Sequence, residues 1–291
     1  MRACVILTHI SVAPQSSWLD TFPEIYYNFF QITKGGGLNT MSELRKALVT
    51  GAGSGIGRHV AVALMQNGFS VTLVGRREES LKETATLAEK FASNALVTPG
   101  DVSKPNSVRD IFSRHIAQFG RLDLLFNNAG INVPDSLLED MPFSDWDKVV
   151  SINLTGYFLC AQQAVRIMKA QKPRGGRIIN NGSVSAQVPR PLAVAYNATK
   201  HAVLGLTKSI SLEGRSFDIC CTQLDIGNAA TELTESMETG MPQGDGSIRP
   251  ETRMHVGNVS QTVLYLANLP LEANVPFLTI TSNTMPFIGR G

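Results

Sequence analysis

The chain has 291 residues, of which 43% are hydrophobic and 17% are charged, a balance typical of a soluble globular protein rather than a disordered or fibrous one. Its net charge of +2 and the lack of a Lys/Arg run exclude a basic nucleic-acid-binding groove. Its four cysteines show neither CxxC nor metal-ligand spacing, which favours free thiols in a reducing compartment such as the cytoplasm and predicts no metal site. No segment has the composition of a membrane span, so no membrane partner is expected.

The first forty residues differ in pattern from the rest and end in the glycine run of "QITKGGGLNT" (31–40). Their few basic residues are matched by acidic ones, unlike an Arg-rich targeting peptide. We expect residues 1–41 to be an N-terminal extension that is disordered or dispensable. A docking role for the aromatic cluster Phe22–Phe30 is the alternative. Residues 42–291 then form one domain.

From Met41 onward, short apolar runs alternate with segments of helical length and periodicity. Such alternation is typical of βαβ units, whose parallel strands are covered by helices on both faces. The sequence therefore predicts a single α/β domain with a doubly wound, mostly parallel sheet, the Rossmann fold. The expected strands are 47–50, 70–75, 95–100, 122–127, 176–181, 218–224 and a last one within 274–282.

The segment "LVTGAGSGIGRHVAVALMQNG" (48–68) reads as a strand, a glycine turn and an amphipathic helix. Gly51, Gly55 and Gly57 would permit a tight turn and let backbone N–H groups at the helix start approach a pyrophosphate. A glycine turn alone is weak evidence, but the strand before it and the helix after it are the context that a dinucleotide site requires.

The end of the second strand, "VGRREES", selects the nucleotide. NAD-binding sites place an acidic residue there to bond the adenosine ribose, whereas this chain has Gly75, Arg76 and Arg77. Two guanidiniums could bind a 2′-phosphate, so NADP(H) is expected to be preferred, with NAD(H) possible. Alternatively, the arginines belong to a solvated helix start. After the third strand, Asp101 in "GDVS" could bond the adenine amine.

Four further motifs follow in order: "NNAG" (127–130), "SIN" (151–153), "NGS" (181–183) and "YNATK" (196–200). With "TGAGSGIG" (50–57), their order closely resembles the short-chain dehydrogenases/reductases in their compact form, over about 250 residues. Two departures are visible. Ile226-Gly227 stands where the family usually has Pro-Gly, and the chain ends "MPFIGRG" instead of with Asp-Gly-Gly.

The resemblance implies four catalytic residues: Asn153, Ser183, Tyr196 and Lys200. It also implies a homotetramer or dimer built on the helices around 143–171 and 196–214. The cofactor-binding positions expected from the motifs are Gly51, Ser54, Gly55, Ile56, Gly57, Arg76, Arg77, Asp101, Val102, Asn128, Ala129, Gly130, Tyr196, Lys200, Gly227 and Thr231.

Tyr196 and Lys200 are four residues apart and so share one face of a helix. A free phenol has a pKa near 10, which the Lys200 ammonium and an oxidised nicotinamide ring would lower. Tyr196 would then act as the acid–base. Ser183 would bond the substrate oxygen, with Ser185 as the alternative hydroxyl, and Asn153 would position a water that relays protons to Lys200.

The expected function is therefore hydride transfer between NADP(H) and a carbonyl or secondary alcohol. The alternatives are an NAD-dependent alcohol dehydrogenase and a non-catalytic nucleotide-binding protein. Segment 228–250 is expected to form a mobile lid over the substrate. Segments 131–138 and 187–194 would line the other sides, with Arg190 as an exposed cation that could meet an acidic group.

Overall fold

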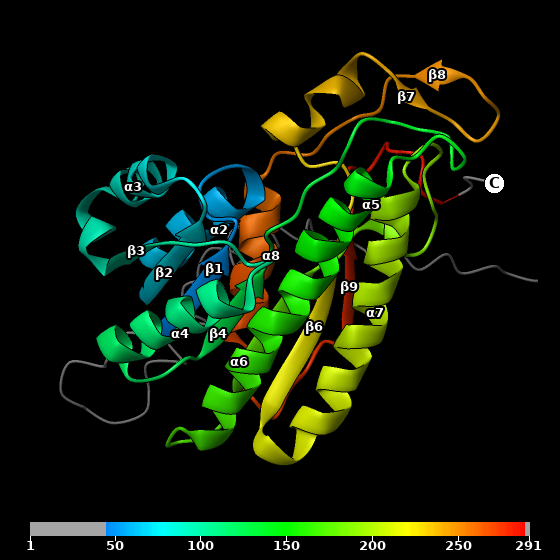
Figure 1. Ribbon diagram of the computed structural model, residues 1–291. Helices are drawn as coiled ribbons and strands as arrows, with labels where there is room; N and C mark the ends of the chain where they lie inside the picture. The colour runs from blue at the N-terminus through cyan, green and yellow to red at the C-terminus, as the bar shows by residue number, and fades with distance from the viewer. Residues whose placement is uncertain (1–44, 289–291) are drawn as a thin grey trace, which may run out of the picture. The chain divides into compact units, whose positions relative to one another are not determined.

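The computed structural model describes residues 45–288, so the expected extension (1–41) lies outside the described residues. Seven parallel strands form one sheet in the order β3-β2-β1-β4-β5-β6-β9 (Figure 1). This arrangement confirms the predicted fold and all seven predicted strands. The strands are β1 (Arg45–Thr50), β2 (Phe69–Gly75), β3 (Ala95–Pro99), β4 (Leu124–Asn127), β5 (Gly176–Asn181), β6 (Ile219–Ile226) and β9 (Phe277–Ile280).

Helices cover both faces of the sheet and create two hydrophobic cores. On one face lie α2 (Gly55–Gln66), α3 (Glu78–Leu87) and α8 (Gly257–Asn268), which supply Val60, Leu81 and Val263 to the first core. The other face carries α4 (Pro105–Phe119), α6 (Gly156–Ala170) and α7 (Val194–Gly214), with Ile111, Ala164 and Ile210 in the second core. The shorter α5 (Phe143–Val150) lies beside α7.

The local sequence explains why these elements form. Every residue of β5 and β6 is buried, as expected for strands that are covered on both faces. Helix α4 starts with Pro105 in its first turn and stops at Gly120, whose φ of 73° is left-handed. In α2, Val60 and Leu64 are buried one turn apart and hold the helix against the sheet.

The chain reverses its direction of winding between β1 and β4. These two strands are hydrogen-bonded neighbours, whereas β2 and β3 continue the sheet on the far side of β1. In open α/β sheets, ligands bind where the carboxyl ends of the strands diverge at such a point. The glycine turn after β1 and the Asn128–Gly130 turn after β4 both lie at this edge.

Segment 228–250, expected as a lid, contains secondary structure. It forms the short helix η5 (Glu232–Glu238) and the antiparallel strands β7 (Met241–Pro242) and β8 (Ile248–Arg249), at the top of Figure 1. A bridge between Ala229 and Met254 and an ion pair between Glu238 and Arg253 tie it to the residues that follow. Its movement stays a prediction.

Within residues 45–288, no helix is both long and apolar enough to cross a membrane. The same part of the chain holds no cluster of His, Cys, Asp and Glu side chains that could bind a metal ion. Its three cysteines, Cys160, Cys220 and Cys221, are buried and unbridged.

Candidate active site

The glycine turn after β1 is shaped by positions that tolerate no side chain. Gly51 and Gly55 have φ values of +68° and +49°, which favour glycine. A Cβ atom on Gly57 would lie 2.2 Å from the carbonyl oxygen of Gly51, so only glycine fits the first turn of α2. Ser54, at the N-cap of that helix, makes no side-chain capping bond, which leaves the first N–H groups of α2 available to an anion.

Two residues that the sequence reasoning did not single out hold this turn in place. The Thr50 hydroxyl accepts hydrogen bonds from the backbone N–H groups of Asn128 (2.8 Å) and Ala129 (2.9 Å), which joins the turns after β1 and β4. Arg58 donates from Nη2 to the carbonyl of Gly53 (2.6 Å) and pairs with Glu83. Thr50 belongs to the quoted motif, whereas nothing in the sequence marked Arg58.

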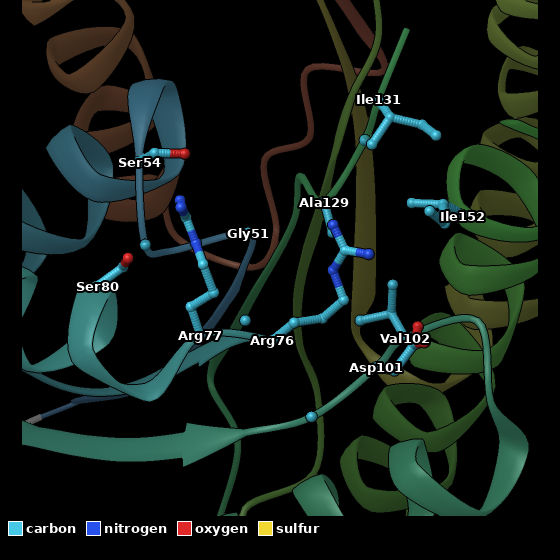
Figure 2. Close-up of a pocket in the computed structure, with 14 residues that line it drawn as sticks. Gly51, Ser54, Arg76, Arg77, Ser80, Asp101, Val102, Ala129, Ile131 and Ile152 are labelled. Carbon is cyan, nitrogen blue, oxygen red and sulfur yellow. The ribbon is translucent and has the colours of Figure 1, made fainter. Parts of the chain in front are cut away.

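A cavity of about 600 Å³ opens beside the glycine turn (Figure 2). It is called the first cavity below. Besides glycines, its wall includes Ser80 and Ile152, which the sequence reasoning missed. The predicted cofactor residues that line it are Gly51, Ser54, Arg76, Arg77, Asp101, Val102, Ala129 and Gly130.

Arg76 and Arg77 follow β2 directly, and both side chains extend into the first cavity in Figure 2. Both residues are exposed, and neither guanidinium makes an ion pair or a hydrogen bond within residues 45–288. Asp101 is the one carboxylate on the described wall. Its Oδ1 accepts hydrogen bonds from the Ser103 N–H (2.9 Å) and hydroxyl (2.8 Å), which fix its orientation.

These residues fit a nicotinamide dinucleotide. The glycine positions leave room for a close approach of the backbone, the uncapped start of α2 suits a pyrophosphate, and the two arginines suit a further phosphate. The residues predicted to bind the pyrophosphate and those predicted to bind the adenosine ribose therefore line one cavity. Gly57 does not line it and instead permits the turn beneath it.

A second cavity of about 540 Å³ adjoins the first, since Ser54, Gly130 and Ile131 line both. Three predicted catalytic residues, Ser183, Tyr196 and Lys200, meet on its wall. The other predicted residues that line it are Gly55, Ile56, Asn128, Gly227 and Thr231.

Ser183 is positioned by a buried carboxylate. Its N–H donates to Oδ1 of Asp225 (3.0 Å), and its hydroxyl accepts from the Ser185 N–H (3.1 Å). A Cβ atom on Gly182 would lie 2.1 Å from the same Asp225 oxygen, so glycine is required between β5 and Ser183. Asp225 was missed in the sequence, because it reads as an ordinary residue of β6.

Tyr196 differs from the sequence expectation in its electrostatics. Burial raises the pKa of Tyr196, while a hydrogen bond with Ser183 and the charge of Arg190 offset part of the rise. Lys200 is not among the groups that shift this pKa, so a lowering by Lys200 alone is not found, and the lowering by Lys200 together with an oxidised nicotinamide ring stays a prediction. The Lys200 ammonium lies over the Tyr196 ring, 5.5 Å from its centre.

The Lys200 ammonium donates to the backbone carbonyl of Asn181 (2.7 Å). The hydroxyl of Tyr157 donates to the same oxygen (3.1 Å), so two donors on α6 and α7 meet at the end of β5. Burial lowers the pKa of Lys200 to about 8, opposed by the negative charge of Asp225. Lys200 is therefore expected to lose its proton at a lower pH than an exposed lysine.

Asn153, the fourth predicted catalytic residue, lines neither cavity. It lies in a π-helical segment, η2 (Ser151–Thr155), between α5 and α6. Its side-chain amide is fully buried and makes two hydrogen bonds with the backbone of Ile131. The amide oxygen accepts from the Ile131 N–H (2.9 Å), and the amide nitrogen donates to the Ile131 carbonyl (2.9 Å). The structure thus shows Asn153 holding the wall segment 131–138, and its relay of protons through a water stays a prediction.

Comparison with known proteins agrees with this geometry. Residues 45–242 match the family model described as short chain dehydrogenase. The chain belongs to the short-chain dehydrogenase/reductase family. It is therefore an NAD(P)-dependent oxidoreductase that acts on CH–OH or C=O groups.

One relative of the enzyme is a 3beta-hydroxysteroid dehydrogenase from Mediterraneibacter gnavus, 37% identical over 65% of this chain and 67% of the relative. Two solved structures are similar in fold. The 3-ketoacyl-(acyl-carrier-protein) reductase from Brucella melitensis complexed with NADH has a TM-score of 0.72 at 26% identity, covering 81% of this chain and 96% of that one. ElxO with NADP bound has a TM-score of 0.72 at 30% identity, covering 82% and 97%.

The departure from the family pattern at Ile226 leaves the end of β6 intact. Ile226 is buried, and Gly227 donates its N–H to the carbonyl of Ile280 in β9 (2.8 Å). Thr231 caps η5, and a Cβ atom on Gly55 would lie 3.6 Å from it. The chain after β6 therefore still reaches the glycine turn without the usual proline.

Arg190 is not the exposed cation that the sequence suggested. Only 11% of its side chain is exposed, and Nη2 forms an ion pair with the buried Glu251 (2.8 Å) and donates to Asn228 (2.7 Å). Arg190 lines the second cavity together with Pro191 and Ala193 from segment 187–194. The predicted walls of the substrate site, 131–138 and 187–194, thus do contribute to it, and Ser136 N–H joins them by bonding the Leu192 carbonyl (3.0 Å).

Proposed function

We propose that the enzyme transfers a hydride between NADP(H) and a carbonyl or secondary alcohol, with Tyr196 as the general acid–base. The observation that carries this proposal is the meeting of Ser183, Tyr196 and Lys200 on the wall of one cavity that adjoins the glycine turn. A substrate carbonyl in the second cavity would lie within reach of the phenol and beside the first cavity, whose residues would hold the cofactor that supplies the hydride.

Each residue has a separate task in the reduction of a carbonyl. Bound NADPH supplies the hydride. Tyr196 donates its proton to the substrate oxygen, and the Ser183 hydroxyl donates a hydrogen bond as negative charge develops there. The Lys200 ammonium stabilises the phenolate that remains, and Asn153 orders a water that returns a proton towards Lys200. Asp225 keeps Ser183 in position through its backbone N–H.

The preference for NADP(H) is supported by Arg76 and Arg77, which project into the first cavity without any partner in the described chain. The end of β2 carries no carboxylate that would repel a 2′-phosphate. Neighbouring structures include one complex with NADH and one with NADP, so the family accommodates both. Dehydrogenation of an alcohol with NAD is the alternative that a cofactor titration decides.

We further propose that the enzyme is a cytoplasmic homo-oligomer, a tetramer or dimer built on α5, α6 and α7. Exposed apolar side chains on these helices support an interface, namely Phe143, Phe158 and Leu212. The unbridged thiols of Cys160, Cys220 and Cys221 suit a reducing compartment. Light scattering coupled to size exclusion measures the oligomeric state, and a monomer at micromolar concentration would contradict the proposal.

The activity is tested by following NADPH and NADH oxidation with a panel of ketones. We expect turnover with NADPH, and a loss of roughly 10²- to 10⁴-fold in kcat for Tyr196→Phe, which removes only the proton donor. Since the aromatic ring remains, NADPH should bind to this variant with unchanged affinity. Equal turnover by Tyr196→Phe and the unmodified enzyme would exclude Tyr196 as the acid.

A further inference from the structure

We propose that Ser185 and Arg190 form a second polar anchor in the substrate cavity, which selects carbonyl substrates that carry a second, uncharged oxygen close to the reacting one. Hydroxyketones and ketoesters are the chemical classes that this anchor fits. The inference deepens the proposed function, because it assumes that the reacting oxygen lies at Ser183 and Tyr196.

The first observation is a pair of polar atoms that lack partners. The hydroxyl of Ser185 and Nη1 of Arg190 are both buried and have no hydrogen-bond partner among residues 45–288. Both residues line the second cavity, and Ser185 itself is 1% exposed. A buried donor without a partner destabilises the fold, and a ligand oxygen at this place would supply the missing bonds.

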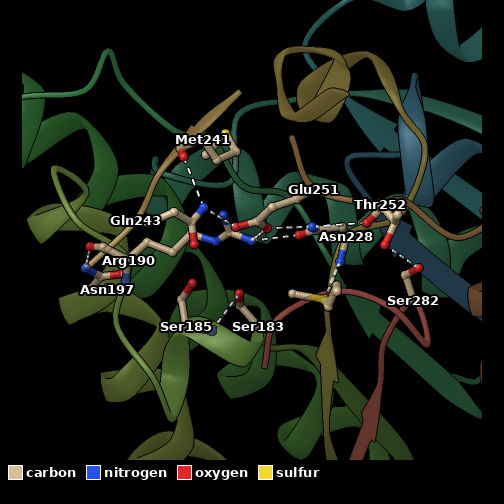
Figure 3. A network of polar contacts seen from close by, with 11 residues as sticks. Ser183, Ser185, Arg190, Asn197, Asn228, Met241, Gln243, Glu251, Thr252 and Ser282 are labelled. Atoms are coloured by element: carbon tan, nitrogen blue, oxygen red, sulfur yellow. Dashed lines mark hydrogen bonds and ion pairs between the residues drawn. The ribbon is translucent and has the colours of Figure 1, made fainter. Parts of the chain in front are cut away.

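The second observation is that the Arg190 side chain is fixed in place. Asn197 clamps its backbone, accepting from the Arg190 N–H (3.2 Å) and donating to its carbonyl (2.7 Å). At the other end, Nη2 is held by Asn228 and Glu251, and Gln243 donates to the second oxygen of that carboxylate (3.0 Å). Figure 3 shows this network, which fixes the orientation of the guanidinium that carries Nη1 and so reduces the entropy lost when a ligand binds.

Charge decides that the bound oxygen is neutral. Two buried or half-buried cations, Arg190 and Lys200, share this region with two buried carboxylates, Glu251 and Asp225. Asp135 and Glu232 add two further carboxylates on the cavity wall, so acidic groups outnumber the cations, and a carboxylate or phosphate on the substrate would bring an unmatched negative charge out of water. A hydroxyl or carbonyl oxygen accepts hydrogen bonds from the guanidinium and the Ser185 hydroxyl without that cost.

The reacting oxygen meets Ser183 and Tyr196, and the second oxygen meets Ser185 and Arg190. The distance between these two places therefore sets the distance between the two substrate oxygens. Ser183 and Ser185 lie side by side, since the Ser183 hydroxyl accepts from the Ser185 N–H (3.1 Å), and both hydroxyls point towards Arg190 in Figure 3. A substrate whose first oxygen meets Ser183 can therefore reach Ser185 with an oxygen on the neighbouring carbon or one carbon further along.

The test compares three ketones: hydroxyacetone, ethyl acetoacetate and butanone, which has a single oxygen. Ser185→Ala removes the hydroxyl, and Arg190→Lys keeps a cation for Glu251 but removes the second donor. We expect KM for the better of the two-oxygen substrates to rise about 3- to 10-fold in Ser185→Ala and about 10-fold or more in Arg190→Lys, with little change in kcat. The ratio of kcat/KM for that substrate over butanone should fall accordingly.

Ser260→Ala is the matched control, because Ser260 on α8 also has a buried, unpartnered hydroxyl and lines neither cavity. Its kinetics should equal those of the unmodified enzyme. An unchanged ratio in both site variants, whether the activities fall together or stay the same, would overturn the anchor while leaving the proposed function standing.

A measurement without turnover keeps the inference testable if none of the ketones is reduced. Ligand-observed NMR with NADPH-saturated protein reports binding of hydroxyacetone and ethyl acetoacetate directly. Binding to the unmodified protein that weakens in Ser185→Ala and Arg190→Lys, but not in Ser260→Ala, supports the anchor. Equal binding to all four proteins, or none to the unmodified protein, contradicts it.

Discussion

The ammonium of Lys200 lies 2.7 Å from the backbone carbonyl oxygen of Asn181 and is held there independently of the Tyr196 phenol, the proposed acid–base. Tyr157 donates to the same carbonyl from the neighbouring helix α6. The charge proposed to stabilise a Tyr196 phenolate is therefore positioned by the end of β5, so removing the Tyr196 hydroxyl should leave Lys200 in place.

This relationship gives a pH prediction. The pKa of Lys200 is lowered by burial to about 8, so the side chain is charged below that pH and neutral above it. Since the charge favours proton release from Tyr196, kcat/KM for ketone reduction should fall as the pH rises through about 8. Lys200→Arg keeps a cation at all these pH values, so that decline should disappear.

Lys208→Arg serves as the control for that profile, because Lys208 is exposed on the same helix. Its pH profile should match that of the unmodified enzyme. If Lys200→Arg retained the same decline near pH 8, another group would be responsible.

Ser183→Ala should reduce kcat by about 10²- to 10³-fold, because it removes a hydrogen bond to the oxygen on which charge develops. Affinity for NADPH should stay unchanged. The comparison with Ser185→Ala separates the two hydroxyls: we expect a KM effect from Ser185 and a kcat effect from Ser183. The reverse pattern would assign catalysis to Ser185.

Arg76→Ala and Arg77→Ala test the cofactor preference. Each should weaken NADPH binding about 10-fold, as expected for the loss of a charge-assisted hydrogen bond at an exposed site, and leave NADH binding nearly unchanged. Arg114→Ala, which removes an exposed arginine from α4, is the control. Tighter binding of NADH than of NADPH by the unmodified enzyme would refute the assignment.

A pair of helix glycines tests the geometry of the cofactor turn. Gly57→Ala places a Cβ atom 2.2 Å from the Gly51 carbonyl oxygen, so it should displace the turn and abolish cofactor binding. Gly205→Ala in α7 meets no atom within 4 Å and should instead raise stability by about 0.5–1 kcal/mol. Calorimetric titration and thermal unfolding distinguish the two results.

The burial of His115 predicts that the free energy of unfolding decreases in acid. Burial lowers its pKa from 6.5 to about 4, and its ring is held by Thr72 (2.7 Å) and the Arg121 carbonyl (2.9 Å). Because the unfolded chain takes up the proton first, stability is complete above about pH 6.5 and is lost as the pH falls towards 4, by up to about 3 kcal/mol. Unfolding of His115→Gln, measured at neutral pH and near pH 4.5, should show a smaller difference between the two conditions.

Local sequence patterns were sufficient to predict the strands and helices of the fold. Strands buried on both faces, such as β5 and β6, are continuous apolar runs in the sequence, and helix α2 shows its buried side as Val60 and Leu64. The Tyr196–Lys200 spacing and the glycine turn were likewise visible, because each depends on backbone geometry within a few residues. The predicted fold and family are confirmed for these reasons.

The electrostatics of the site depended on contacts between distant segments. Arg190 looked exposed in the sequence, but it pairs with Glu251, 61 residues away, and Ser183 is held by Asp225, 42 residues away. Burial then raised the pKa of Tyr196, although its neighbour Lys200 suggested the opposite. The sequence alone determined which elements and chemical groups this protein has. Only the tertiary structure decided their charges and partners, because desolvation and pairing arise where remote segments pack together.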